Sequence, residues 1–295
     1  MMQSKPELFV AIGASAGGLE PLENFFQSIP AKSNMAFFII QHLSPDYKSL
    51  MDEILSRHTS LTINKVEDAM EVEPNSIYLI PAKKEMVIES GKLKLKDKSL
   101  LDQPSMPIDI FFKSLALEAG EKSVGIVLSG SGTDGSRGVL DISRAGGLVI
   151  AQDQQSAKFP SMPQSAFNSG VVDLVLKVEE MYKTLLQYVE SPLGAKETQS
   201  KPDYGEGEIV DIIAMLREKY HIDFNLYKPG TIYRRIERRL SLKQCKTIQD
   251  YYEMLAADEG ELNSLYKDLL IGVTAFFRDP DAFSALEDIV LTDLL

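Results

Sequence analysis

The chain has 295 residues, a formal net charge of −12 and a hydrophobic content of 44%, so its length allows two domains of ordinary size. General binding to nucleic acid is not expected of such an acidic protein, because that binding needs a cationic surface. No apolar run approaches the roughly 20 residues of a membrane span, and no signal peptide is recognisable. We therefore expect a cytoplasmic protein without direct membrane insertion. One cysteine, Cys245, and three histidines argue against a disulfide framework and against a metal site.

The first 190 residues alternate short apolar runs with helical patterns. This alternation predicts an α/β fold with a mainly parallel, doubly wound sheet. A strand-like segment interrupted by Ser90-Gly91 predicts a β-hairpin over residues 85–95. The expected strands are residues 8–13, 35–40, 76–80, 124–130, 147–152 and 172–176, and the expected amphipathic helices include residues 19–26 and 108–115.

The composition changes after residue 190. Residues 191–207 are rich in Ser, Pro, Gly and charged side chains, which predicts a linker with little to bury. Beyond it the strand-like runs stop and helical spacing continues to the end of the chain. The sequence thus predicts a doubly wound α/β domain over residues 1–190, followed by a small all-α domain over residues 208–295.

A serine loop follows the first predicted strand. Gly13-Ala14-Ser15-Ala16-Gly17 fits the G-x-S-x-G pattern of a nucleophile elbow, which turns sharply from a strand into a helix and exposes the serine hydroxyl. Amide hydrogens at the start of the following helix could stabilise an oxyanion there. The alternatives are a helix-capping serine and a phosphate-binding turn. Nucleotide binding is the weaker alternative, because Ser15 interrupts the G-x-G-x-x-G pattern and no G-x-x-x-x-G-K-[ST] occurs.

A catalytic serine needs a base, usually a histidine held by a carboxylate. His42 directly follows the second predicted strand and is therefore expected at the same sheet edge as Ser15. Of the other two histidines, one lies at a predicted helix end and one in the helical region, so position favours His42. Asp134 and Asp153 both follow predicted strands, and the residues alone leave the choice of carboxylate open.

Four ordered motifs identify a family: IGASAGG, IIQHLSPD, LSGSGTDGSRG and AQDQQSAKFPSMPQSA. Together they resemble the protein-glutamate methylesterase (CheB-type) of bacterial chemotaxis. The resemblance implies Ser15 as nucleophile, His42 as base, Asp134 rather than Asp153 as its orienter, and the Ala16 amide as an oxyanion donor.

The same resemblance implies hydrolysis of γ-glutamyl methyl esters, and deamidation of glutamine through a similar oxyanion, without a cofactor. The implied partner is a methylated receptor or another glutamate-methylated signalling protein. A non-catalytic signalling scaffold is the alternative, and the complete triad favours the enzyme. Family members usually carry an N-terminal phosphoacceptor domain, whereas this chain begins close to its first strand, so we expect no control by a receiver of its own.

Two further motifs, YKPGTIYRRIERRL and IGVTAFFRDPDAF, resemble the helical N-terminal part of the chemotaxis receptor methyltransferase (CheR-type). Arg234 and Arg238, like Arg235 and Arg239, stand one helical turn apart. The resemblance implies that these arginines dock to an acidic receptor helix, and the alternative is a solvated basic face.

Thr274 and Arg278 are similar to family positions near S-adenosylmethionine. The chain ends at Leu295, before any Gly-rich loop that could hold that cofactor. We therefore expect S-adenosylmethionine only in a longer esterase–methyltransferase fusion, and no methyl transfer by this chain.

Overall fold

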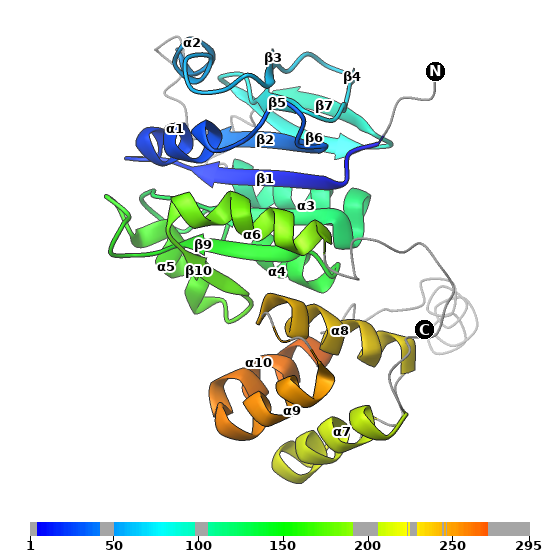
Figure 1. Ribbon diagram of the computed structural model, residues 1–295. Helices are drawn as coiled ribbons and strands as arrows, with labels where there is room; N and C mark the ends of the chain where they lie inside the picture. The colour runs from blue at the N-terminus through cyan, green and yellow to red at the C-terminus, as the bar shows by residue number, and fades with distance from the viewer. Residues whose placement is uncertain are drawn as a thin grey trace, which may run out of the picture.

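The protein folds into a layered α/β domain followed by a helical domain (Figure 1). Within the described parts of the chain, every helix is too short or too polar to cross a bilayer. The computed structural model describes residues 5–41, 50–97, 106–190, 206–222, 224, 229–243, 245 and 247–270.

Seven parallel strands form the central sheet, in the order β10-β9-β8-β1-β2-β5-β3. Burial on both faces explains why most of these strands are continuous apolar runs, and the predicted parallel sheet is confirmed. The strands are β1 (Leu8–Ala14), β2 (Met35–Gln41), β3 (Thr62–Lys65), β5 (Ser76–Leu79), β8 (Ser123–Val127), β9 (Leu148–Gln152) and β10 (Leu174–Leu176).

The strand order reverses at β1. On one side of β1 lie β2, β5 and β3, in that spatial order. The chain then crosses over and forms β8, β9 and β10 on the other side. In open α/β sheets, ligands bind outside the carboxyl ends of the strands at such a switch point. A ligand site is therefore expected at the loops that follow β1 and β8.

A small antiparallel sheet contains β4 (Met70–Glu71), β6 (Lys84–Glu89) and β7 (Lys92–Asp97). Ser90 and Gly91 connect β6 to β7 with φ values of 53° and 73°, which is typical of a two-residue hairpin turn. Their main-chain N–H groups donate to the carboxylate of Glu118 at 2.8 and 2.7 Å. The predicted hairpin is confirmed.

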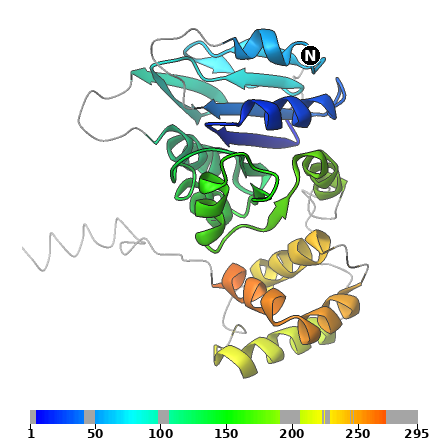
Figure 2. The ribbon, with the colours of Figure 1, turned by 90° about the vertical axis from the view of Figure 1, so that its left-hand side faces the viewer.

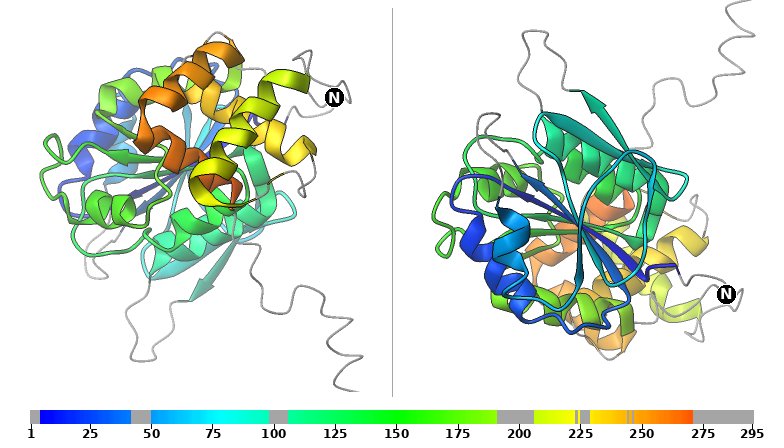
Figure 3. Two further views of the ribbon diagram at one scale, coloured as in Figure 1. Left: turned by 90° about the horizontal axis from the view of Figure 1, so that it is seen from below. Right: turned by 90° about the horizontal axis from the view of Figure 1, so that it is seen from above.

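Helices cover both faces of the central sheet, as the view from above makes clear (Figure 3). One face carries α1 (Leu19–Gln27), α2 (Met51–Leu55) and α6 (Val178–Glu190). The other carries α3 (Pro107–Ala119), α4 (Gly138–Arg144) and α5 (Ser161–Asn168). Most apolar positions predicted for α1 and α3 are buried, namely Leu22, Phe25, Phe26, Ile108, Phe111, Phe112 and Leu115.

The described part of the second domain is helical, with its own apolar core, and it lies beside the β10 side of the sheet (Figure 2). Its helices are α7 (Glu206–Tyr220), α8 (Pro229–Leu242), α9 (Ile248–Ala257) and α10 (Glu259–Leu269). Helix α7 begins at Glu206, inside the stretch predicted as linker, so the helical domain starts slightly earlier than the composition indicated.

Candidate active site

Ser15 lies directly after β1 and is half-buried. Its main-chain N–H donates to the carbonyl of Ser129 at 3.1 Å, which ties the loop after β1 to the loop after β8. The Ser15 carbonyl accepts a hydrogen bond from Gly18 at 3.0 Å. Because the peptide group is planar and trans, the Ala16 N–H points to the opposite side of that peptide. The loop can therefore offer a hydroxyl and an amide donor side by side, and no described residue accepts from this amide.

Two glycines make this loop possible. Gly17 has a φ of +71°, and a Cβ added there would lie 2.8 Å from the ring of Phe159. A Cβ on Gly130, in the loop after β8, would lie 2.1 Å from the sulfur of Met162 and 3.0 Å from the Cβ of Ser15. Both positions need glycine, because neighbouring side chains fill the space beside the serine.

Two buried polar residues, Ser129 and Gln152, connect the loops around Ser15. The Ser129 hydroxyl donates to the carbonyl of Ala16 at 3.0 Å and accepts from the N–H of Phe159 at 3.0 Å. The Ser129 N–H donates to Oε1 of Gln152 at 2.8 Å, and Nε2 of Gln152 donates to the carbonyl of Ser156 at 3.2 Å. The loops after β1, β8 and β9 are thus held as one unit. Sequence analysis did not single out either residue, although a polar residue that ends a buried strand is a usable signal.

Asp134 lies in the loop after β8 with 1% of its surface exposed. Its Oδ2 accepts from the N–H of Ile108 at 3.0 Å, and its Oδ1 accepts from the N–H groups of Asp109 and Gly135 at 3.0 and 2.9 Å. Two of these donors belong to the first turn of α3, where N–H groups lack partners within the helix and carry the positive end of the helix dipole. The carboxylate is therefore fixed in orientation, as a residue that orients a catalytic histidine must be.

A second carboxylate, that of Asp109, stands next to Asp134. Its Oδ1 accepts from the N–H groups of Arg137 and Gly138 at 3.0 and 2.7 Å. Burial raises the pKa of Asp109, and the Asp134 carboxylate raises it further against the opposing hydrogen bond from Gly138. Asp109 was not predicted from the sequence, because an acidic side chain in the first turn of a helix is common and belongs to no catalytic motif.

The proposed base, His42, lies outside the described residues. Gln41, which ends β2, pairs with Ala14 at the end of β1, so the residue before His42 is beside the residue before Ser15. His58 follows α2, and its Nε2 lies 3.9 Å from a carboxylate oxygen of Glu23.

Asp153, the other carboxylate considered from sequence, opens a turn after β9. Its carbonyl accepts from the N–H and the hydroxyl of Ser156, the latter at 2.8 Å. In the structure Asp153 therefore forms a turn, whereas three main-chain N–H groups donate to the carboxylate of Asp134.

The predicted arginine face differs from expectation. Arg235, Arg238 and Arg239 are buried, with 4%, 3% and 4% of their surface exposed. Nη2 of Arg238 donates to the carbonyl of Gly147 at 2.6 Å and pairs with Asp173 at 2.5 Å. Groups of the α/β domain cover Arg238, and Glu261 of α10 pairs with Arg239, so the prediction of an exposed docking face is corrected for the three buried arginines.

The side chain of the fourth arginine, Arg234, is not among those that the structure describes. Thr274 and Arg278, the residues predicted near S-adenosylmethionine, lie outside the described residues. Within the described ranges, no cluster of three His, Cys, Asp or Glu side chains is arranged to hold a metal ion.

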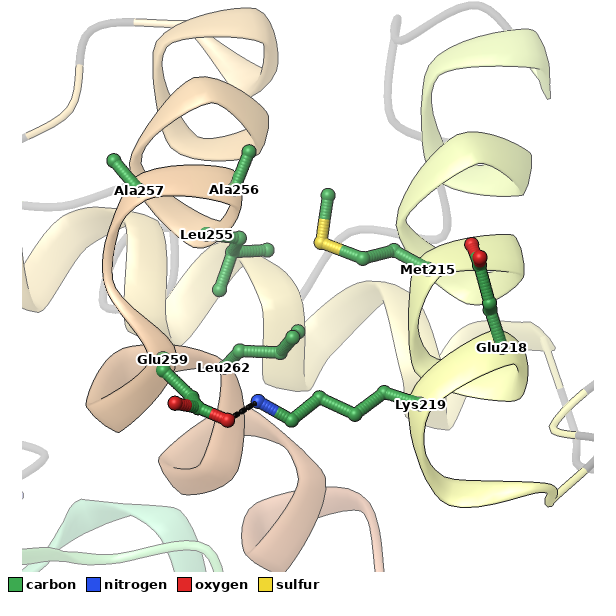
Figure 4. A pocket seen from close by; sticks show the side chains of 8 residues that line it. All are labelled: Met215, Glu218, Lys219, Leu255, Ala256, Ala257, Glu259 and Leu262. Carbon is green, nitrogen blue, oxygen red and sulfur yellow. Dashed lines mark hydrogen bonds and ion pairs between the residues drawn. The ribbon is translucent and has the colours of Figure 1, made fainter.

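An open groove of about 510 Å³ lies in the helical domain between α7 and the α9–α10 pair (Figure 4). Lys219 and Glu259 form an ion pair across it. Its described lining contains no serine, cysteine or histidine, so it lacks the chemistry of the serine loop. The lining residues are Met215, Glu218, Lys219, Leu255, Ala256, Ala257, Glu259 and Leu262.

Comparisons with known proteins agree with this geometry. Residues 10–185 match the family described as CheB methylesterase, and residues 207–270 match the one described as CheR methyltransferase, all-alpha domain. The solved structure of the CheB methylesterase catalytic domain from Thermotoga maritima is similar with a TM-score of 0.57 and 26% identity, over 61% of this chain and 97% of that domain.

Relatives are also found among curated proteins. An uncharacterized 104.1 kDa protein in the hypE 3′ region of Rhodobacter capsulatus is 38% identical in an alignment of 269 residues that covers 83% of this chain and 28% of that protein. Proteins named protein-glutamate methylesterase/protein-glutamine glutaminase from Photorhabdus laumondii and Salmonella typhimurium are 31% and 32% identical over 63% of this chain. The chain spans 54% of the length of each of these two relatives.

Proposed function

Because the chain belongs to the CheB methylesterase family, we propose that it hydrolyses γ-glutamyl methyl esters on a signalling protein, with Ser15 as nucleophile, His42 as base and Asp134 as orienter. One observation carries the proposal. Ser15 and Asp134 follow the adjacent strands β1 and β8 at the switch point of the sheet, and three main-chain donors hold the Asp134 carboxylate. Ligand sites of α/β sheets lie at this position.

The first half of the reaction is acyl transfer. His42 removes the hydroxyl proton of Ser15 while the oxygen attacks the ester carbonyl carbon. The negative charge that develops on the carbonyl oxygen is stabilised by the Ala16 N–H, whose direction follows from the Gly18 hydrogen bond to the Ser15 carbonyl. The C–O bond then breaks, and methanol leaves with the proton that His42 returns.

The second half is hydrolysis of the acyl-enzyme. His42 takes a proton from water, the hydroxide attacks the acyl carbon, and Ser15 leaves with its proton restored. The product is a glutamate carboxylate. A glutamine side chain passes through the same two steps with ammonia as leaving group, so we include protein-glutamine deamidation, which the names of two relatives also mention. Both halves use only protein groups and water.

The surface beside Ser15 suits a protein substrate. Phe159 has 39% of its surface exposed, although its ring also contacts Gly17 within the serine loop. An exposed aromatic ring beside a nucleophile can bury apolar surface of a bound partner. This supports a methylated receptor, or another glutamate-methylated signalling protein in the cytoplasm, as the substrate.

The test is methanol release from a receptor methylated at glutamate. We expect the parent chain to release methanol and Ser15→Ala and His42→Ala to fall to background. Asp134→Asn should lower kcat by about 10⁴-fold, the usual effect of removing a triad carboxylate. Asp153→Asn is the matched control, because this aspartate also follows a sheet strand and should leave kcat unchanged.

The same experiment separates enzyme from scaffold. A folded parent chain that releases no methanol but still binds the methylated receptor would contradict the esterase proposal and support a non-catalytic signalling module. Ammonia release from a receptor that carries glutamine at the same sites tests the deamidase activity separately.

A further inference from the structure

We infer that Asp109 is a positioning residue of the esterase reaction, because its carboxylate clamps the loop that carries Asp134 onto α3. This inference rests on the proposed function. It assigns a role to the half-buried Asp109 carboxylate, which the triad chemistry itself does not use.

Each of the two aspartates accepts hydrogen bonds from main-chain groups of the segment that carries the other. Main-chain N–H groups of α3, from Ile108 and Asp109, donate to the Asp134 carboxylate at 3.0 Å each. In return, N–H groups that follow Asp134 in the chain, from Arg137 and Gly138, donate to Oδ1 of Asp109 at 3.0 and 2.7 Å. Four hydrogen bonds thus cross between the start of α3 and the segment from Asp134 to the start of α4.

This reciprocal arrangement fixes Asp134 from both sides. The α3 donors set the direction of its carboxylate, and the Asp109 clamp sets the distance of its backbone from α3. Catalytic groups must be held within about 0.5 Å of their productive positions, and a displacement of about 1 Å can lower the rate by about 100-fold. Loss of the clamp should therefore act on catalysis through Asp134.

Charge adds a second consequence. Asp109 places a carboxylate next to Asp134, which is the proposed partner of the His42 imidazolium. A negative charge in this position favours the protonated histidine, so it raises the pH at which the base becomes active. A residue that only capped α4 would have no such effect on the pH profile.

Two substitutions separate these effects. Asp109→Asn keeps an oxygen acceptor for Arg137 and Gly138 but removes the charge, whereas Asp109→Ala removes both. Glu118→Ala is the matched control, because Glu118 also lies on α3 and also accepts two main-chain N–H groups, from Ser90 and Gly91 in the hairpin. Thermal unfolding of each full-length variant establishes that it is folded.

Methanol release from receptor methylated at glutamate is then measured across pH. For Asp109→Ala we expect kcat to fall by about 10- to 100-fold with little change in KM, as for a displaced catalytic group. For Asp109→Asn we expect most of kcat to be retained, while the acid limb of kcat/KM, which reports the free base, moves to lower pH. Glu118→Ala should leave kcat and the acid limb at their parent values.

The outcomes are distinguishable. A parent chain without Ser15-dependent methanol release overturns the proposed function and this inference with it. An active parent whose Asp109→Ala variant is folded and keeps its kcat overturns this inference alone. So does an Asp109→Asn variant in which neither kcat nor the acid limb differs from the Glu118→Ala control.

Discussion

The hydroxyl of Ser129 lies 3.0 Å from the carbonyl oxygen of Ala16, the residue after the proposed nucleophile. The same hydroxyl accepts a hydrogen bond from Phe159 at 3.0 Å, and Ser129 is completely buried. A buried hydroxyl that is satisfied in this way stabilises the conformation of both loops that it joins. The geometry of the serine loop therefore depends on Ser129, which follows the neighbouring strand β8.

Replacing Ser129 with alanine should lower kcat about tenfold or more, because loss of the hydroxyl frees the Ala16 carbonyl and lets the serine loop shift. Leaving buried partners unsatisfied should also lower the free energy of unfolding by about 1–3 kcal/mol. Methanol release and urea unfolding measure the two effects.

Ser123→Ala is the matched control for that substitution. Ser123 is equally buried at the other end of β8, and its hydroxyl donates to the carbonyl of Gly120. It should lose similar stability with unchanged kcat. Equal losses of kcat in the two variants would show that Ser129 acts only through the stability of the domain.

Gly17→Ala should abolish most activity, because its Cβ would lie 2.8 Å from the Phe159 ring and 3.0 Å from the Ser129 hydroxyl. Gly91→Ala is the control, since Gly91 has nearly the same φ, +73° against +71°, and nothing within 4 Å of an added Cβ. Both variants carry the backbone strain of about 1 kcal/mol of a left-handed alanine, but only Gly17→Ala adds a clash. Similar methanol release by the two variants would contradict this argument.

Much of the fold could be predicted from the sequence, because buried parallel strands are continuous apolar runs. The strand β3 was missed, since its residues Thr62–Lys65 are mostly polar and it lies at the edge of the sheet. The last predicted residues of the fourth strand, Leu128–Gly130, belong to the loop that supports Ser15 instead. Apolar character alone does not distinguish a strand end from a buried loop.

The candidate site was predicted less completely than the fold. Ser15 and Asp134 were proposed from motifs, whereas Asp109 and Ser129 contact main-chain groups that are distant in sequence. The arginines of α8 show a different limit. Their spacing predicted a basic face, yet whether a charged face meets solvent or another domain depends on tertiary contacts that periodicity does not encode.

Asp173→Ala should loosen the contact between the two domains. Asp173 accepts from the N–H of Val149 at 2.8 Å and pairs with Nη2 of Arg238, whose Nε and Nη1 have no hydrogen-bond partner among the described residues. Removing one partner of a buried ion pair leaves an uncompensated charge and costs about 3–5 kcal/mol. We expect easier proteolysis between the domains and a lower unfolding temperature.

Asp141→Ala provides the comparison for Asp173→Ala. Asp141 pairs with Arg144 on α4 at 3.5 Å, with the arginine side chain about half exposed, and an exposed pair contributes about 0–1 kcal/mol. The combined variant Asp173→Ala/Arg238→Met should recover part of the stability, because it removes the Arg238 charge together with its partner. Equal stability of Asp173→Ala and Asp141→Ala would contradict the role of the buried pair.

The helical domain should lose stability in acid through Glu261. Burial alone raises the pKa of Glu261, but paired hydrogen bonds from Arg239 at 2.6 and 2.7 Å and the charge of Lys243 bring this pKa below its ordinary value. A carboxylate with a lowered pKa stabilises the folded state above the unfolded value of about 4.3. That contribution is lost as the pH falls through the lower folded pKa.

Glu261→Gln should therefore unfold at lower urea concentration near neutral pH and show a flatter loss of stability below about pH 4, since it has no such carboxylate to protonate. Far-UV circular dichroism of the helices at several pH values measures both effects. Glu259→Gln is the matched control on α10, because Glu259 pairs with Lys219 at the surface and exposed pairs contribute little. If the two variants have the same unfolding profile at every pH, the buried Arg239–Glu261 pair does not stabilise this domain, and its burial must be attributed to packing of the surrounding helices alone.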